Sequence, residues 1–149
     1  MKGYLKMPEK TAEVIELIDG YRWYRTGDKG HLDEDGFLTI VDRYSRFAKI
    51  GGEMISLTTV EEEILDACND KDLEIAATCL PDQRKGEKIV LLATNNLDKN
   101  QLKKLLSDAK VNPLYHPAQV LMVEEIPKLG SGKTDFGATK KIALVNEQK

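Results

Sequence analysis

The chain changes character near residue 42. Before that point the chain has little apolar material and only short strand candidates. Two of these, 30–32 and 37–41, lie on either side of Asp33-Glu34-Asp35-Gly36. Asp-Gly favours a tight reversal because glycine tolerates positive φ. Beyond residue 42, strand candidates alternate with amphipathic helix patterns. We therefore predict an α+β domain preceded by a strand-rich fragment. The fragment has too little apolar material for its own core, so we expect it to belong to a larger domain.

Periodicity and turn residues predict the individual elements. Thr58 and Glu61 have the spacing of a capping box, which opens a helix with Val60, Ile64 and Cys68 on one face. Asp135 is the expected cap of the last helix. The other predicted elements are helices at 8–18, around 102–109 and at 136–146, and strands at 21–24, 47–50, 53–57, 73–80, 88–95 and 120–126.

Composition is that of an ordinary globular protein of about one domain. Of 149 residues, 41% are hydrophobic and 32% are charged, and the net charge of −3 argues against a general nucleic-acid binder. No apolar run approaches the roughly 20 residues of a membrane span, and the start lacks a secretory signal pattern. Cys68, Cys79, His31 and His116 lack metal-ligand spacing. We predict free, buried thiols, no metal site and a cytoplasmic location.

Three clusters carry the candidate chemistry: Tyr24–Asp28, Asp42-Arg43 together with 49–52, and 127–135. Each has a structural explanation when taken alone. Thr-Gly-Asp is a common turn, 49–52 fits a bulged hairpin, and a Gly-Ser-Gly-Lys loop fits a surface turn with a solvated lysine.

The third cluster also invites comparison with a P-loop, because Gly132-Lys133-Thr134 stands between a predicted strand and a predicted helix. That motif requires a glycine five residues before Gly132, where this chain has Pro127. Proline has no N–H to donate to a phosphate and cannot adopt positive φ. We therefore reject the P-loop interpretation.

In this order and at these separations, the three clusters resemble the final motifs of the adenylate-forming superfamily, which includes acyl-CoA synthetases, luciferases and peptide-synthetase adenylation domains. The resemblance begins at Gly3-Tyr4 and covers nearly the whole chain. Segments 47–57 and 129–136 are most similar to the bacterial bifunctional acyl-[acyl-carrier-protein] synthetase/2-acylglycerophosphoethanolamine acyltransferases. The resemblance implies that 1–42 is the tail end of an N-terminal AMP-binding domain. It implies that 43–149 is a C-terminal mobile domain with a small mixed sheet and packed helices.

The resemblance also implies roles for individual residues in the first half-reaction. Asp28 accepts hydrogen bonds from the ribose hydroxyls of ATP, and its charge strengthens them. Arg43 lies against the same ribose or the phosphate. Lys133 is the adenylation lysine, a mobile point charge directed at the carboxylate and α-phosphate oxygens as negative charge develops. The Mg²⁺ that accompanies ATP has its expected ligands outside this chain.

A second set of residues is implied for domain rotation and thioester formation. Asp42 and Ser45 fall in the hinge, and Lys49, Gly51 and Gly52 form the face that admits a phosphopantetheine arm. The family usually has Asp or Lys at the pivot where this chain has Ser45. Arg46 is a candidate substitute for that missing charge.

The implied enzyme is an ATP-dependent ligase that transfers a fatty acid to acyl carrier protein, for lysophospholipid reacylation, with the parent protein at the cytoplasmic face of the inner membrane. The fragment alone is expected to be inactive without its N-terminal domain. Two alternatives remain: the C-terminal domain of a long-chain acyl-CoA synthetase, and a non-catalytic module that docks a carrier protein. A carrier protein is acidic, and a basic face for it is available in Arg84, Lys85, Lys88, Lys103, Lys104 and Lys110.

Overall fold

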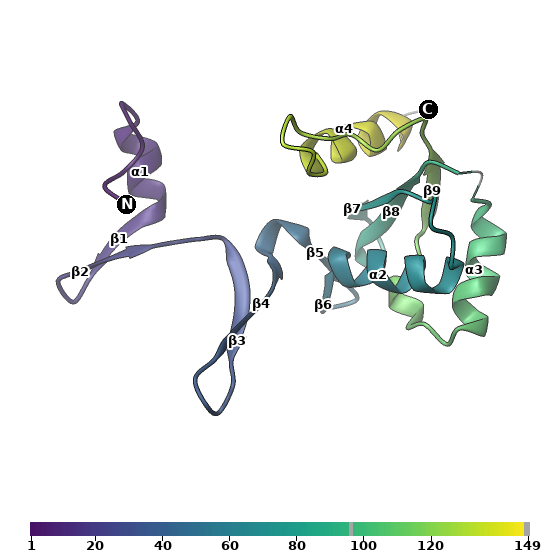
Figure 1. Ribbon diagram of the computed structural model, residues 1–149, viewed down its shortest axis with the longest axis horizontal. Helices are drawn as coiled ribbons and strands as arrows, with labels where there is room; N and C mark the ends of the chain where they lie inside the picture. The colour runs from purple at the N-terminus through teal and green to yellow at the C-terminus, as the bar shows by residue number, and fades with distance from the viewer. Residues whose placement is uncertain (96, 148–149) are drawn as a thin grey trace. The chain divides into compact units, whose positions relative to one another are not determined.

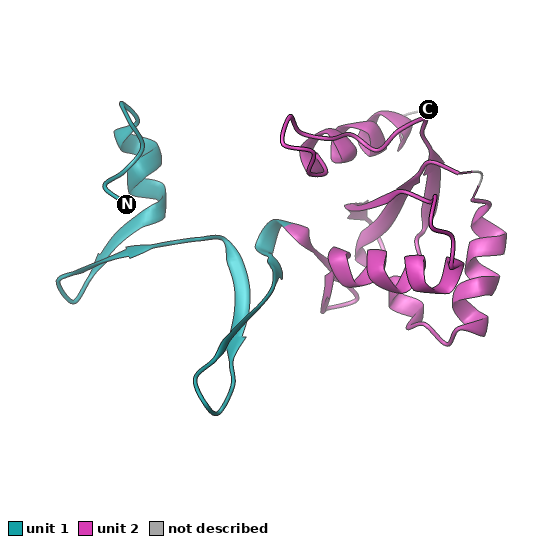
Figure 2. Cartoon of the chain, viewed as in Figure 1, with its two compact units in different colours: residues 1–45 teal, residues 46–149 magenta. Residues whose placement is uncertain are grey.

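The computed structural model describes residues 1–95 and 97–147. The chain divides into two compact units, Met1–Ser45 and Arg46–Lys149, which Figure 2 shows in separate colours.

Unit 1 (Met1–Ser45) consists of one short helix and two antiparallel hairpins. They are formed by α1 (Pro8–Val14), β1 (Ile15–Ile18), β2 (Tyr21–Tyr24), β3 (Asp28–Leu32) and β4 (Leu38–Arg43). The strand predicted at 21–24 and the hairpin predicted around 33–36 are confirmed. The helix predicted at 8–18 is wrong in its second half, because the chain leaves the helix after Val14 and pairs β1 with β2.

No residue of unit 1 is buried. Its aromatic and aliphatic side chains remain exposed, including Trp23 at 60% and Phe37 at 71%. A hairpin without a covered apolar face is marginally stable in water. Unit 1 therefore lacks a hydrophobic core of its own.

Unit 2 (Arg46–Lys149) is built on a mixed five-stranded sheet (Figure 1). Four strands follow the order β6-β5-β8-β7 in antiparallel pairs, and β9 joins β8 in parallel. The elements are β5 (Phe47–Ile50), β6 (Glu53–Ser56), α2 (Leu57–Cys68), β7 (Ile75–Asp82), β8 (Gly86–Ala93), α3 (Lys99–Asp108), the 3-10 turn η2 (Pro113–Tyr115), β9 (Gln119–Met122) and α4 (Phe136–Glu147). The 3-10 turn η1 (Tyr44–Arg46) spans the boundary between the two units.

Helices cover both faces of this sheet. Alternate residues of a strand point to opposite faces. Accordingly, Ala77 and Cys79 of β7 pack with α2 and α3, whereas Ala76 and Leu80 of the same strand pack with α4. Figure 1 shows α4 on the side of the sheet away from α2 and α3. The predicted α+β domain with a small mixed sheet is confirmed.

Helix α2 begins differently from the prediction. Its cap is Ser56, whose hydroxyl accepts a hydrogen bond from the Thr59 N–H at 3.3 Å, so the predicted capping box of Thr58 and Glu61 does not form. The predicted cap of α4 is confirmed, because Asp135 Oδ1 accepts from the Ala138 N–H at 2.9 Å. Within the described part of the chain, no helix has the length and apolarity that crossing a bilayer requires.

Candidate functional site

Asp28 and Arg43 lie opposite each other across the β3–β4 hairpin. They are register partners, and Arg43 Nε lies 3.2 Å from Asp28 Oδ1. The Asp28 N–H donates to Thr26 Oγ1 at 3.1 Å, and the Tyr44 N–H donates to the carbonyl of Gly27 at 2.9 Å, which fixes the turn before β3. An exposed pair of this kind adds little stability. It does hold Asp28 Oδ1 beside a positive charge, and an ionised carboxylate has further lone pairs that can accept hydrogen bonds from hydroxyl donors.

Tyr24, which sequence reasoning did not select as a site residue, stands beside this pair and interacts with Tyr4. A hydrogen bond with Tyr4 raises the pKa of the Tyr24 phenol, and the Arg43 charge opposes that rise. Tyr24 immediately precedes the Arg-Thr-Gly-Asp segment, so its position in the first cluster was the available signal.

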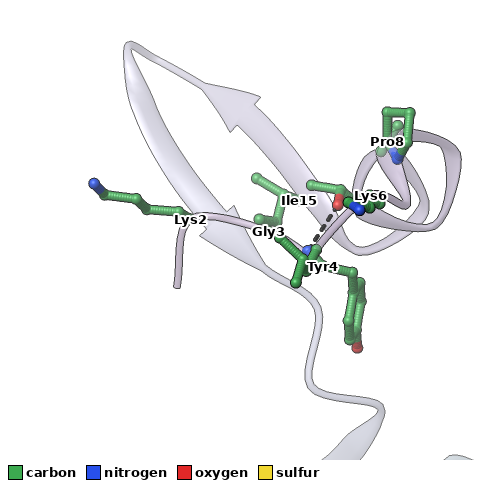
Figure 3. Close-up of a pocket in the computed structure, with 9 residues that line it drawn as sticks. Lys2, Gly3, Tyr4, Lys6, Pro8 and Ile15 are labelled. Carbon is green, nitrogen blue, oxygen red and sulfur yellow. Dashed lines mark hydrogen bonds between the residues drawn. The ribbon is translucent and has the colours of Figure 1, made fainter.

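Tyr4 also lines a hollow of about 540 Å³ in unit 1 (Figure 3). Its backbone N–H donates to Thr11 Oγ1 at 2.9 Å, the contact drawn there as a dashed line. None of the predicted site residues lines this hollow.

The predicted hinge residues lie at the junction of the two units. Asp42 is the penultimate residue of β4 and accepts from the Arg43 N–H at 2.7 Å through Oδ1. Ser45 is exposed and is the last residue of unit 1.

Arg46 does not replace the missing pivot charge. Its side chain is only 5% exposed and pairs with Glu61 at 2.5 Å. The guanidinium also donates to the Ala77 carbonyl at 3.1 Å and to Thr58 Oγ1 at 3.2 Å, and its Cζ lies 3.7 Å from the centre of the Phe136 ring. A buried charge that is already paired is unavailable as a solvent-facing pivot, so the suggestion made from sequence is wrong. Arg46 instead joins the start of β5 to α2, β7 and the first residue of α4.

Lys49, Gly51 and Gly52 occupy the β5–β6 hairpin. Gly51 and Gly52 have φ of +61° and +93°, the conformation of a two-residue turn that strongly favours glycine. The turn is fastened at two points: the Lys49 N–H donates to Glu87 Oε2 at 2.5 Å, and the Gly51 N–H donates to the Lys85 carbonyl at 2.9 Å. A Cβ at either glycine would meet no atom within 4 Å, so their backbone is open to an approaching ligand. The Lys49 side chain is exposed.

Lys133 stands on a closed turn between β9 and α4. Lys128 and Thr134 form an isolated antiparallel bridge, and the Leu129 N–H donates to the Lys133 carbonyl at 2.7 Å. Gly132 has φ of +80°, which allows the reversal. The backbone of Lys133 is therefore held while its side chain is exposed.

The structure brings Asp28 and Arg43 together in unit 1, and places Lys49, Gly51, Gly52 and Lys133 in unit 2. Within 1–95 and 97–147, no group of three or more His, Cys, Asp or Glu side chains is arranged to hold a metal ion.

Comparison with known proteins gives this arrangement a context. Over 133 residues the chain is 36% identical to the 2-succinylbenzoate–CoA ligase of Listeria monocytogenes, covering 88% of this chain and 27% of that protein. It is 34% identical to the long-chain-fatty-acid–CoA ligase of Bacillus subtilis over 137 residues, covering 89% of this chain and 23% of that protein. ATP-bound MatB from Rhodopseudomonas palustris superposes with a TM-score of 0.74 at 25% identity, over 95% of this chain and 28% of MatB.

The chain has the fold of the C-terminal domain of adenylate-forming enzymes. Acyl- and aryl-CoA ligases are among its homologues. No protein-family model matches the chain. The chain spans about a quarter of the length of these two ligases, 27% of the Listeria protein and 23% of the Bacillus protein.

Proposed function

We propose that this chain is the C-terminal part of an ATP-dependent, AMP-forming acyl ligase. In the first step, the carboxylate of a fatty acid attacks the α-phosphorus of ATP, and pyrophosphate leaves. In the second, a phosphopantetheine thiol attacks the acyl carbon, the S–C bond forms, and AMP leaves with the electron pair of the broken C–O bond. Residues 1–42 complete the AMP-binding domain, and 43–149 are the mobile domain. The chain alone is inactive because the acyl and Mg²⁺ sites lie elsewhere in the parent protein.

The observation that carries this proposal is the pairing of Asp28 with Arg43 directly before the junction of two compact units, with Lys133 held on a closed turn of the second unit. Asp28 binds the ribose, Arg43 neutralises charge on the nucleotide, and Lys133 stabilises the negative charge of the adenylation transition state. The hinge residues Asp42 and Ser45 then let unit 2 turn, so that Lys49, Gly51 and Gly52 admit the thiol.

Two thiol acceptors fit this scheme. We propose acyl carrier protein, in lysophospholipid reacylation by a parent enzyme at the cytoplasmic face of the inner membrane, because segments 47–57 and 129–136 resemble that group of ligases. Coenzyme A fits equally well, since the homologues are CoA ligases. Rates with the two acceptors, measured on one full-length preparation, separate the possibilities.

The test of the adenylation step is fatty-acid-dependent ATP–pyrophosphate exchange by the full-length parent. Lys133→Ala removes one pre-aligned charge, which typically lowers such a rate about a hundred- to a thousandfold. Lys141→Ala removes an exposed lysine of α4 and should leave exchange unchanged. Thioester formation from pre-made acyl-adenylate should survive Lys133→Ala. Absence of exchange in the wild type, or full activity in Lys133→Ala, would contradict the proposal.

A further inference from the structure

The turn that presents Lys133, here called the Lys133 turn (residues 128–134), is closed on itself by backbone hydrogen bonds. Its Leu129 N–H donates to the Lys133 carbonyl at 2.7 Å. At its beginning, Lys128 pairs with Glu74 at 2.8 Å, but the two side chains are 48% and 51% exposed. An exposed ion pair contributes little stability. The position of Lys133 therefore depends on how the other end of the turn is held.

That other end is the start of helix α4, where the ring of Phe136 lies over the guanidinium of Arg46. The Arg46 Cζ is 3.7 Å from the centre of the ring, well within the roughly 6 Å of a cation–π contact. Phe136 is three residues from Lys133, and Asp135 between them caps α4 by accepting from the Ala138 N–H at 2.9 Å. The turn, the helix cap and the ring are therefore consecutive parts of one stretch of backbone.

Arg46 gives this ring a fixed surface to pack on. Its side chain is 5% exposed, and its guanidinium pairs with Glu61 at 2.5 Å and donates to the Ala77 carbonyl at 3.1 Å. A guanidinium is planar, so it can donate hydrogen bonds in its plane while an aromatic ring stacks on its face. The donors of Arg46 are held by α2 and β7, and Phe136 contacts the same group.

Phe136 itself is not a core residue. It is 40% exposed and belongs to neither of the two hydrophobic clusters found among the described residues. The ring therefore buries little apolar area in the core, and its contact with a buried cation serves mainly to orient the backbone to which it is attached.

We propose that Arg46 and Phe136 are positioning residues that set the place of the Lys133 ammonium for adenylation. The ring on the guanidinium fixes the start of α4, and the start of α4 fixes the last residues of the Lys133 turn. Displacing a catalytic group by about 1 Å can cost about a hundredfold in rate. The role in adenylation rests on the proposed function, whereas the anchoring of the turn does not.

The anchoring is tested on the 149-residue chain by amide hydrogen exchange followed by NMR. Arg46 is left in place, because its removal would also destabilise unit 2. Phe136→Leu keeps an apolar side chain but removes the ring. The N–H groups of Leu129 and Gly132, which donate within the turn, should then exchange about three- to thirtyfold faster, the factor that corresponds to a lost cation–π contact.

Two further variants are the controls for this measurement. Phe136→Tyr keeps the ring and should exchange like the wild type. Leu144→Ala changes another apolar residue of α4, exposed at 39%, and should leave the turn unaffected. Equal exchange in Phe136→Leu and the wild type would overturn the proposal.

The kinetic test uses the full-length parent. Phe136→Leu should lower the maximal rate of fatty-acid-dependent ATP–pyrophosphate exchange about ten- to a hundredfold, because Lys133 is displaced but still present. KM for ATP and for the fatty acid should stay unchanged, and so should thioester formation from pre-made acyl-adenylate. Phe136→Tyr should retain exchange, and Leu144→Ala is again the matched control. An equal loss in both half-reactions would show a general structural role and overturn the proposal.

A double variant separates positioning from other effects. If Phe136 acts only through Lys133, Phe136→Leu should cause no further loss of exchange in a Lys133→Ala background. A further loss of about tenfold there would overturn the inference and leave the proposed function intact. A wild type without exchange would defeat the proposed function and with it the role in adenylation, and the amide-exchange result would then decide on the anchoring.

Discussion

Replacing Arg46 by methionine tests whether the buried ion pair holds unit 2 together. The Arg46 side chain is 5% exposed and that of Glu61 is 16% exposed, so water has little access to the position of the lost partner. Removing one member of a buried pair typically destabilises a protein by about 3–5 kcal/mol, because the other charge stays buried without compensation. The variant also loses the donors to Ala77 and Thr58 and the cation–π contact with Phe136.

These losses share one side chain and do not add independently. We therefore expect a total of about 3–5 kcal/mol, which is a large part of the roughly 5–15 kcal/mol of a typical domain. The expected decrease in Tm exceeds about 10 °C.

The assay is urea and thermal unfolding of the 149-residue chain, followed by far-UV circular dichroism. Arg46→Met/Glu61→Gln should be more stable than Arg46→Met, because it also removes the charge that has lost Arg46, and glutamine still accepts the bond that Glu61 Oε1 receives from the Ala77 N–H at 2.6 Å. Lys128→Met is the control, since the Lys128–Glu74 pair is exposed at 48% and 51% and should contribute less than about 1 kcal/mol.

Either of two results would refute this reasoning. One is a loss below about 1 kcal/mol in Arg46→Met, the range of a solvated surface pair. The other is a destabilisation of Arg46→Met/Glu61→Gln equal to the sum of those of Arg46→Met and Glu61→Gln, because this double-mutant cycle would then show no interaction between the two side chains.

Further predictions concern the thiols and the glycine turn. Burial raises the pKa of the Cys68 and Cys79 thiols, so both should react slowly with a thiol reagent at pH 8. Because the thiol pKa values are higher in the folded than in the unfolded chain, the stability that this difference contributes is complete below the unfolded thiol pKa and is lost as pH rises through the folded pKa. The Tm should therefore fall above about pH 9, and it should fall less steeply in Cys79→Ala. Gly52→Ala, at φ of +93°, should lower stability by about 1–2 kcal/mol in urea unfolding, whereas Gly130→Ala, where φ is not positive, should have little effect.

Local sequence patterns predicted the elements whose cause is local. The Asp33–Gly36 reversal and the Asp135 cap depend on residues within a few positions of one another, and both are present. The same rule would have found the β1–β2 hairpin, because Asp19-Gly20 is an Asp-Gly pair between two strand-like segments, with φ of +51° and +80°. The prediction instead extended the helix that begins at Pro8 as far as Ile18, over the residues of β1, because Pro8 suits the first turn of a helix.

The prediction for the start of α2 was wrong for a reason that lies outside the local sequence. Thr58 and Glu61 have capping-box spacing, yet both side chains contact Arg46, and Glu61 also accepts from the backbone of Ala77. The buried guanidinium of Arg46, just before β5, donates hydrogen bonds to the Thr58 and Glu61 side chains that the local pattern assigned to the helix end. Ser56 caps the helix instead. The role of Arg46 was hidden for the same reason, because its partners come from three other elements.

The Lys133 turn and the Gly51–Gly52 turn, which are proposed to act in the two chemical steps, are attached near opposite ends of strand β7. The segment that carries Lys133 is attached near the beginning of β7, where Lys128 Nζ lies 2.8 Å from Glu74 Oε1. The glycine turn is attached near the end of β7, through the hydrogen bond between the Gly51 N–H and the Lys85 carbonyl. The strand has eight residues, and at about 3.3 Å each its ends are about 25 Å apart. On the proposed function, this separation favours rotation of unit 2 between the two chemical steps, at the predicted hinge that ends at Ser45, even with no charge at the pivot.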